Sequence, residues 1–301
     1  MQIKNKGIYF ALLTALISGF SVFFNKFATG QFKDAYVFTT LKNILVAAGL
    51  IGILMIPKIF RELKTLNKKD WLSLLLIGLI GGAIPFLLFF KGLTLTSAVS
   101  GALIHKTLFI WVGILAVIFL KEKFGRLQWV AFALLFGGNL LLGGLKSWTF
   151  GTGELMIFGA TLLWSVEYVF AKRALLKLSS EVVAWGRMFF GALILIGFVA
   201  FTGRGGGLIP AANQISWLAL SSILLLGYVL TWYKALKYER ASVVTAILVP
   251  ASLITTALNS IFVTHQFSWE NMAAGVLFLA AIILIWKMRP QNIYGTVAQK
   301  I

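Results

Sequence analysis

Residues 91–124 read KGLTLTSAVSGALIHKTLFIWVGILAVIFLKEKF, and residues 234–267 read KALKYERASVVTAILVPASLITTALNSIFVTHQF. The two segments align without a gap at an offset of 143 residues, so that Lys91 pairs with Lys234 at the start. Apolar composition alone rarely keeps two segments in register over such a length. We therefore infer that the chain contains an internal duplication.

The duplication extends into the remainder of both halves. Near the start of each half the offset drifts to 145 or 146 residues, where it pairs Lys42 with Arg187 and Lys26 with Lys172. Because basic residues are rare inside apolar segments, their recurrence at matching positions supports the duplication independently of hydrophobicity.

Most of the chain consists of apolar stretches long enough to cross a membrane. Hydrophobic residues make up 59% of it and charged residues 12%, and the mean hydropathy of +0.92 is typical of membrane proteins. A span needs about 20 apolar residues and must be helical, because lipid offers its backbone no hydrogen-bond partners. We expect spans near residues 7–28, 35–56, 71–90, 96–119, 127–145, 154–171, 182–202, 214–233, 242–263 and 269–287.

Five spans per repeat is an odd number, so the second repeat must enter the membrane from the opposite side and lie inverted relative to the first. The predicted fold class is an all-α membrane protein with ten transmembrane helices in two inverted five-helix repeats. The predicted boundaries are 1–146 for the first repeat, 147–290 for the second and 291–301 for a cytoplasmic tail. We expect the first span to be retained rather than cleaved as a signal peptide, since its loss would break this symmetry.

The basic residues behind the net charge of +18 are distributed unequally between the two sides of the predicted bundle. Of the 27 Lys and Arg residues, three lie within spans, five lie in connections on one side, and the remaining 19 lie on the side of both termini. Such a bias in short connections is the positive-inside rule, which places both termini in the cytoplasm. We therefore expect the lipid bilayer, and no nucleic acid, as a partner. The five are Lys26, Lys33, Lys91, Lys146 and Arg204.

The chain lacks the residues that several functional classes of protein require. The chain has no cysteine, which excludes disulfides and cysteine-ligated metal sites. Its two histidines, His105 and His265, are far apart in the sequence, and no glycine-rich phosphate loop ends in Lys-Ser or Lys-Thr. We therefore expect no metal, no cofactor, no enzyme activity and no ATP-driven pumping.

Four short motifs add a family resemblance. They are Trp164-Ser165 followed by Lys172, Trp185-Gly186-Arg187, Leu248-Val249-Pro250, and Leu120-Lys121-Glu122-Lys123. In their order and duplication they resemble the EamA-type transporters of the drug/metabolite transporter superfamily over nearly the whole chain. The resemblance implies ten helices, inverted halves and movement of small metabolites, often outward.

The chain departs from the pattern of that family at two places. In span four, His105-Lys106 stands where small residues are usual, and Thr107 stands where a proline is expected. In the second half, His265 takes the place of Glu122. The first departure is a candidate for substrate specificity, whereas the second falls in a connection and is not expected to bear on the substrate.

The candidate site is defined by charges near the middle of the membrane. His105 and Lys106 lie near the middle of span four, and Glu167 in span six is the only carboxylate well within a span. Because such groups are expensive in lipid, they normally face the bundle interior or a water-filled cavity. Two interpretations stand: Lys106 and Glu167 form a structural ion pair, or Lys106 binds a carboxylate or phosphate of the cargo while His105 or Glu167 takes up a proton.

Other candidates surround these charges. Trp164 and Tyr168 lie close to Glu167. Lys42 and Arg187 either add to a positive cavity or anchor the repeats to backbone carbonyls; we favour anchoring for the pair, with Arg187 the better candidate for the cavity. Polar stripes at helical spacing add four further candidates, which either line the cavity or pack helices together. They are Ser21 and Asn25 in span one and Thr256 and Asn259 in span nine.

We predict a secondary transporter that moves a small polar metabolite by alternating access, in the plasma membrane of a bacterium or archaeon. The basic groups favour an anionic or zwitterionic substrate such as an amino acid or organic acid, with protons as a candidate coupling ion. The family resemblance favours export. The alternatives are an exchanger of phosphorylated metabolites, an uncoupled facilitator and a membrane scaffold that transports nothing.

Overall fold

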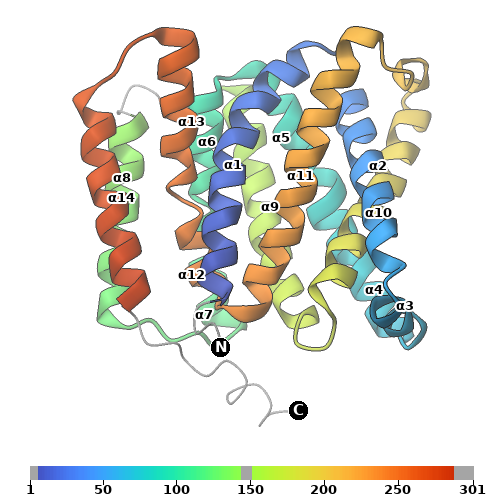
Figure 1. The fold of residues 1–301 in the computed structure, drawn as a ribbon, viewed down its shortest axis with the longest axis horizontal. Helices are drawn as coiled ribbons and strands as arrows, with labels where there is room; N and C mark the ends of the chain where they lie inside the picture. The colour runs from blue at the N-terminus through green and yellow to red at the C-terminus, as the bar shows by residue number, and fades with distance from the viewer. Residues whose placement is uncertain (1–5, 144–150, 288–301) are drawn as a thin grey trace.

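The computed structural model describes residues 6–143 and 151–287. All regular elements in this described part are helices, which stand side by side as a bundle (Figure 1). The all-α class is therefore confirmed. In chain order the elements are α1 (Lys6–Gly30), α2 (Ala35–Leu54), α3 (Pro57–Lys64), α4 (Lys68–Ile77), the π-helix η1 (Gly78–Ala83), α5 (Ile84–Leu95), α6 (Ala98–Lys106), α7 (Leu108–Phe119), α8 (Arg126–Gly143), α9 (Thr152–Ala174), α10 (Ser180–Phe201), the 3₁₀ turn η3 (Gly205–Gly207), α11 (Ala212–Tyr238), α12 (Ala241–Ile247), α13 (Ala251–Asn259), the π-helix η4 (Ser260–Thr264) and α14 (Trp269–Lys287).

Nine stretches of the described chain are long and apolar enough to cross a membrane. Three of them contain more than one helix: Lys68–Leu95, Ala98–Phe119 and Ala241–Thr264. A shorter apolar helix, Arg126–Leu142, lies where the fifth span was predicted, and the last residues of that prediction fall outside the described part. The tail 291–301 also lies outside it. The count of ten spans and the cytoplasmic placement of the termini stay predictions.

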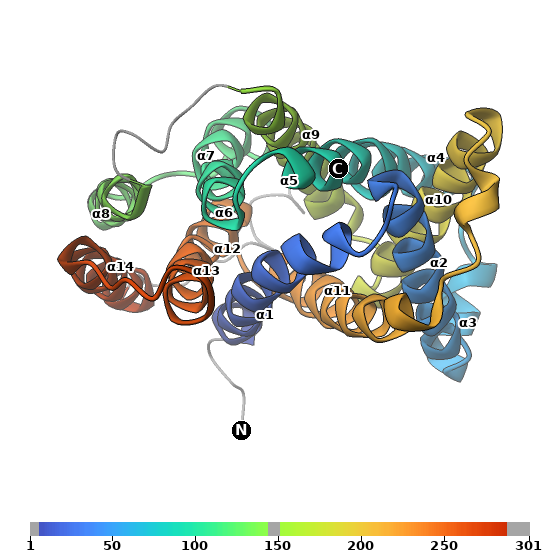
Figure 2. The same cartoon turned by 90° about the horizontal axis from the view of Figure 1, so that it is seen from above.

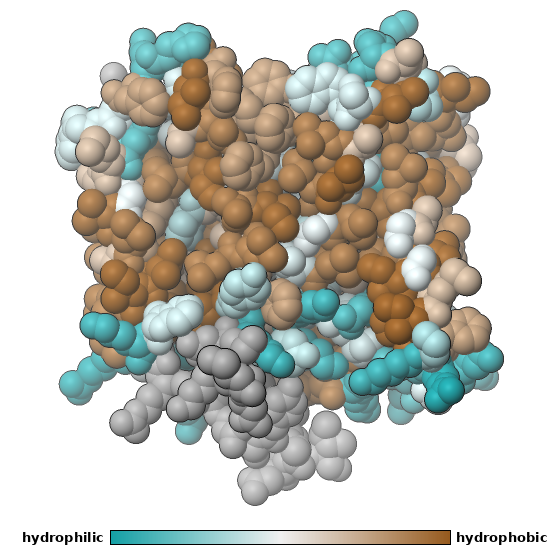
Figure 3. All heavy atoms as spheres, in the orientation of Figure 1, coloured by the Kyte–Doolittle hydropathy of each residue, from teal (hydrophilic) through white to brown (hydrophobic). Residues whose placement is uncertain are grey.

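Apolar side chains form a broad band across the face shown in Figure 3, between two rims where polar side chains gather. On α14, at one edge of the bundle (Figure 2), Met272, Val276 and Leu279 are 77%, 65% and 63% exposed. Contact of such a surface with lipid tails costs no free energy, whereas its exposure to water is unfavourable. We name the rims after the connections that they carry, the loop-120 face (120–125) and the loop-265 face (265–268).

The fourth and ninth spans are interrupted at equivalent positions. The fourth changes from α6 to α7 at Thr107, whose hydroxyl donates a hydrogen bond to the Ile104 carbonyl at 2.7 Å. The ninth changes from α12 to α13 at Pro250, which lies 143 residues further along and has no N–H to continue the helix. The break is therefore present in both repeats, although only one of them carries the proline.

The third span contains the π-helical turn η1, which packs very closely against α10. A Cβ atom on Gly82 would lie 2.2 Å from the Arg187 carbonyl oxygen, and one on Gly191 would lie 2.5 Å from the Gly82 carbonyl oxygen. Only glycine allows two helix backbones to approach so closely. This contact places η1 directly against the part of α10 that carries Arg187.

The duplication is visible in individual hydrogen bonds. Lys26 of α1 and Lys172 of α9, which the sequence pairs, each donate to two carbonyl oxygens at the C-terminal end of a neighbouring helix. Carbonyl groups at a helix end lack partners within the helix and attract a cation. The acceptors are Leu93 (2.8 Å) and Thr96 (2.5 Å) for Lys26, and Leu236 and Glu239 (2.7 Å) for Lys172. Both pairs of acceptors are related by the offset of 143 residues.

Candidate functional site

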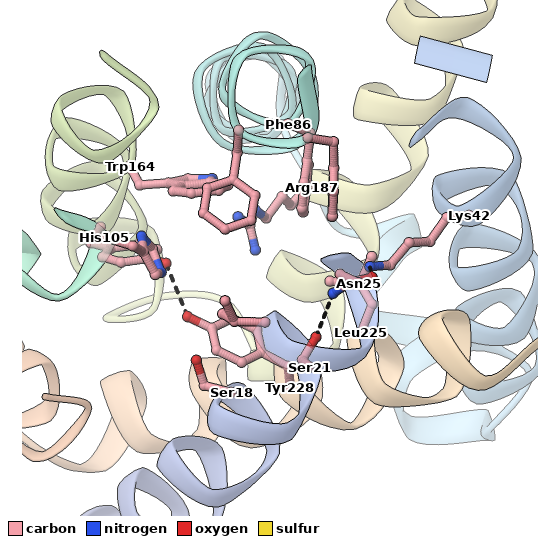
Figure 4. Close-up of a pocket in the computed structure, with 14 residues that line it drawn as sticks. Ser18, Ser21, Asn25, Lys42, Phe86, His105, Trp164, Arg187, Leu225 and Tyr228 are labelled. Carbon is pink, nitrogen blue, oxygen red and sulfur yellow. Dashed lines mark hydrogen bonds between the residues drawn. The ribbon is translucent and has the colours of Figure 1, made fainter. Parts of the chain in front are cut away.

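A cavity lies among α1, α2, α5, α6, α9, α10 and α11, near the middle of the bundle (Figure 4). It holds about 470 Å³ of empty space, part of which is open to solvent. Basic, hydroxyl, amide and aromatic side chains line it, but no carboxylate does so in the described part of the chain. The lining residues are Ser18, Ser21, Val22, Asn25, Lys42, Phe86, Phe89, Phe90, His105, Trp164, Tyr168, Arg187, Leu225 and Tyr228.

The first cation of the cavity, Lys42, is held without a carboxylate. Its Nζ donates to Asn25 Oδ1 at 2.8 Å and lies 4.5 Å from the centre of the Phe90 ring. Arg187 is the equivalent of Lys42 in the second repeat, and Tyr233 is the equivalent of Phe90. The Arg187 Cζ atom lies 5.9 Å from the centre of the Tyr233 ring. A ring face stabilises a nearby cation but does not neutralise its charge. Both cations therefore add positive potential to the cavity.

The second cation, Arg187, is anchored by a backbone carbonyl. The Gly81 oxygen accepts hydrogen bonds from Arg187 Nη2 at 3.0 Å and from Trp164 Nε1 at 2.9 Å. In a regular α-helix this carbonyl would bond to the N–H four residues later, but that residue is Pro85, which has none. Pro85 therefore offers no N–H to the Gly81 carbonyl, which accepts hydrogen bonds from two side chains of other helices.

The guanidinium of Arg187 retains unused donors. Within the described part of the chain, its Nε and Nη1 have no hydrogen-bond acceptor, and no ion pair shorter than 4.0 Å joins it to Glu167. Glu167 instead accepts a hydrogen bond from the Tyr233 hydroxyl at 2.6 Å. Gly81 lies between the two charges, since a Cβ there would be 2.4 Å from Glu167 Cγ and 3.1 Å from Arg187 Nε. The arginine charge is thus offset in part by a nearby carboxylate but not paired with it.

Aromatic rings form the wall opposite α1. Trp164 contacts the His105 ring at 4.9 Å between centroids, Phe89 at 5.4 Å and Phe86 at 5.5 Å. The Nδ1 atom of His105 is buried and has no partner in the described part of the chain. The wall therefore offers flat apolar surfaces and one imidazole that can accept or donate a hydrogen bond.

Lys106 and Glu167 do not form the ion pair that was one of the two interpretations from sequence. Lys106 is 1% exposed, and its Nζ donates to Ser18 Oγ at 2.7 Å, whereas Glu167 bonds to Tyr233. Successive residues of a helix point about 100° apart, so His105 reaches the cavity while Lys106 turns toward α1. Lys106 does not line the cavity.

Of the ten residues predicted for the site, six line the cavity and four do not. Asn25 donates to Ser21 Oγ at 2.9 Å, which joins two of the six. The six are Ser21, Asn25, His105, Trp164, Tyr168 and Arg187. The four that lie elsewhere are Lys106, Glu167, Thr256 and Asn259, of which the last two belong to α13.

The sequence favoured an anchoring role for Lys42 and Arg187 as a pair, and it did not indicate several aromatic residues that line the cavity. The pairing of Lys42 with Arg187 at an offset of 145 residues was the signal that would have placed both in the cavity. Phe86, Phe89 and Tyr228 carried no such signal, because the chain contains 26 Phe and 7 Tyr and nothing in the sequence distinguishes these three from the others.

The chain is similar to a family of known proteins, to individual relatives in sequence and to a solved structure. The family model described as the EamA-like transporter family matches residues 5–144 and 151–287. An uncharacterized transporter of Bacillus subtilis, YyaM, is 30% identical over 79% of this chain and 80% of its own length. The riboflavin transporter ImpX of Fusobacterium nucleatum is 28% identical over 79% of this chain and 84% of its own length. A solved structure titled only as a crystal structure of a protein superimposes with a TM-score of 0.74 at 16% identity, over 93% of this chain and 96% of that one, which shows a shared fold.

Proposed function

Because the chain belongs to the EamA-like transporter family, we propose that it is a secondary carrier of a small anionic or zwitterionic metabolite, such as an amino acid or organic acid. The observation that carries this proposal is the buried guanidinium of Arg187, a residue that lines the cavity and whose Nε and Nη1 have no acceptor in the described chain. A carboxylate or phosphate oxygen on the cargo would supply the missing acceptors.

The energetic argument is that an unpaired buried charge is expensive. Burying an ion costs several kcal/mol unless it gains a partner, and an arginine fork matches a carboxylate with two parallel hydrogen bonds. Lys42 adds a second positive charge to the same cavity, and within residues 6–143 and 151–287 its one hydrogen-bond acceptor is the Asn25 amide oxygen. A negatively charged group on the cargo compensates both.

The mechanism that fits inverted repeats is alternating access. The two repeats, residues 1–146 and 147–290, would rock around the cavity and expose it to either side in turn. Ten spans, cytoplasmic termini, a bacterial or archaeal plasma membrane and export all belong to this proposal. His105 and Glu167 are the groups through which protons would couple to transport, since both are buried beside Arg187 or Trp164.

A second candidate cargo is a phosphorylated metabolite, which the same two cations would hold. Aromatic side chains in the lining favour a cargo with a flat ring, because ring faces stack on one another. The relative named as a riboflavin transporter makes ring compounds worth including in any test. An uncoupled facilitator and a membrane scaffold that transports nothing remain rivals, and the first of these would show no counterflow.

The test is ligand-dependent stabilisation of the purified protein in detergent. Aliphatic acids, ring-containing acids, sugar phosphates, zwitterions and cations are compared on the wild type and on Arg187→Lys, which keeps the charge but loses the fork. A bound ligand raises the melting temperature by mass action, and a concentration of 100 times Kd corresponds to about 2.7 kcal/mol.

We expect acids or phosphates to stabilise the wild type and the response to fall in Arg187→Lys. Arg204→Lys is the matched control, because Arg204 pairs with Asp34 at the rim and lies outside the cavity. Stabilisation by cations alone, or an anion response unchanged in Arg187→Lys, would contradict the proposal. Ligands that bind are then loaded into proteoliposomes, where counterflow separates a carrier from a facilitator or a scaffold.

A further inference from the structure

The connection after α7 reaches across to the other repeat and caps a helix there. The Glu122 carboxylate accepts a hydrogen bond from the Ala241 N–H at 2.8 Å, from the Ser242 N–H at 3.3 Å and from the Ser242 hydroxyl. Arg240 adds a second link between the same segments by donating to the Lys123 carbonyl at 3.1 Å. One carboxylate thus ties the 120–125 connection to the first turn of α12 at the loop-120 face.

The need for this cap is explained by the residue that precedes α12. The first N–H groups of a helix have no partner within it, and they attract a negative charge. Arg240 occupies the cap position and its side chain provides no capping bond. In the first repeat the equivalent residue is Ser97, whose hydroxyl accepts from the Ser100 N–H at 3.0 Å. Hence α6 caps itself, whereas α12 depends on Glu122 from the other repeat.

At the loop-265 face the equivalent contact is not made. His265 stands at the place of Glu122 and is exposed, and no hydrogen bond between described residues joins it to α6. The first turn of α6 is partly exposed at Val99 and Ser100. Its equivalents in α12 are sealed, because Ser242 is 0% and Val243 3% exposed.

The position of the cavity agrees with this asymmetry. On α1 its lining residues run from Ser18 to Asn25, in the half of the helix that leads to the loop-265 face (Figure 1). On α5 they are Phe86, Phe89 and Phe90, and α5 also ends at that face. These residues place part of the lining toward the loop-265 face, and Tyr168, Arg187 and Tyr228 place the rest near the middle of the bundle. In the described part of the chain, no residue of α12 lines the cavity.

We propose that Glu122 is a functional residue of the transport cycle, acting as a latch that closes the cavity at the loop-120 face. Release of its carboxylate from Ala241 and Ser242 lets the start of α12 move away from the 120–125 connection and opens that face. His265 cannot form the matching latch, so the state closed at the loop-120 face is the favoured one. This inference rests on the proposed carrier function, since only alternating access requires both faces to open.

The chain has no cysteine, so single cysteines report the two faces directly. Val243→Cys in α12 and Ser100→Cys in α6 occupy equivalent positions of the two repeats. Each is reacted with a charged maleimide in detergent, where both faces meet the solution, and the labelling rates are compared. We expect Ser100→Cys to label rapidly and Val243→Cys slowly. Adding Glu122→Ala should speed the labelling of Val243→Cys roughly 5- to 30-fold, the population shift that the loss of a helix cap produces.

Matched variants keep the test decisive. Glu122→Gln retains one acceptor oxygen and should give a smaller increase, and His265→Ala should leave the rate at Val243→Cys unchanged. If Glu122→Ala does not fold, Ser242→Ala is the second variant: it removes the hydroxyl, which is one of the three hydrogen-bond donors to Glu122, and should also speed labelling. An unchanged rate in folded Glu122→Ala, or Val243→Cys labelling as fast as Ser100→Cys in the otherwise unaltered chain, overturns the latch. No cargo is added, so this result is independent of whether anions are transported.

Discussion

Replacement of Gly81 by alanine tests whether the space between Glu167 and Arg187 is essential. The new Cβ would lie 2.4 Å from Glu167 Cγ, 2.8 Å from Glu167 Cδ and 3.1 Å from Arg187 Nε, all shorter than a normal contact. Glu167 is fully buried, so its side chain has little room to withdraw. Overpacking of this kind costs about 1–3 kcal/mol. We therefore expect Gly81→Ala to lower the free energy of unfolding and to displace Arg187 from the Gly81 carbonyl.

The control for this substitution is Gly52→Ala. Gly52 lies within α2, and a Cβ there would meet nothing within 4 Å. The Gly52→Ala variant therefore measures the gain in helix propensity alone, which is up to about 1 kcal/mol for an alanine in place of glycine. The difference between the two variants is then the overpacking at Gly81.

A double-mutant cycle identifies the clash. Glu167→Ala removes Cγ and Cδ, so the double variant has room for the new methyl group. Unfolding by SDS in mixed micelles would give the four free energies of the cycle. We expect a coupling of at least about 1 kcal/mol, because residues in contact are not additive. Additivity within about 0.5 kcal/mol, or equal stabilities of Gly81→Ala and Gly52→Ala, would refute the reasoning.

Three further predictions concern charges that the cavity does not use. Lys106→Met should be neutral or stabilising by about 1 kcal/mol, because the ammonium is buried with a hydroxyl as its only hydrogen-bond partner; a loss of the anion-induced shift in melting temperature would show instead that Lys106 acts on the cargo. Lys26→Met and Lys172→Met should each destabilise the fold by about 1–3 kcal/mol, since each strands two carbonyl groups at a helix end; markedly unequal melting temperatures of the two variants would contradict their equivalence. Burial raises the pKa of Glu239, just after α11, above its ordinary value of 4.5, so its favourable contribution is present at acid pH and is lost as the pH rises through the raised pKa. Glu239→Gln should therefore flatten the pH dependence of unfolding between pH 4.5 and the raised pKa, and an unaltered pH profile would count against a buried carboxyl there.

The inverted duplication could be predicted from sequence in considerable detail. An ungapped offset of 143 residues pairs the acceptors of Lys26 with those of Lys172, one residue for one residue. It also pairs the break at Thr107 with the break at Pro250. Because the two repeats fold alike, a matched position in sequence becomes a matched position in space.

The candidate site was predictable only in part. Arg187, His105 and Trp164 were expected near a cavity because polar or amphipathic groups in mid-span turn away from lipid, and all three line it. Lys106 and Glu167 met the same criterion and lie outside the lining. Polarity at mid-span thus indicates that a side chain faces inward, but not which inward surface it meets.

Periodicity and span length are properties of neighbouring residues, so they suffice to predict that this chain is helical, apolar and duplicated. Which basic residue keeps unused donors depends on contacts between helices. Lys106 donates to a serine of α1, whereas Arg187 donates to the Gly81 carbonyl, to which Pro85 offers no N–H. That carbonyl belongs to the backbone of another helix, and its availability depends on a π-helical turn and on packing between distant segments. No pattern along one span encodes such a contact, so it emerges only when the helices come together.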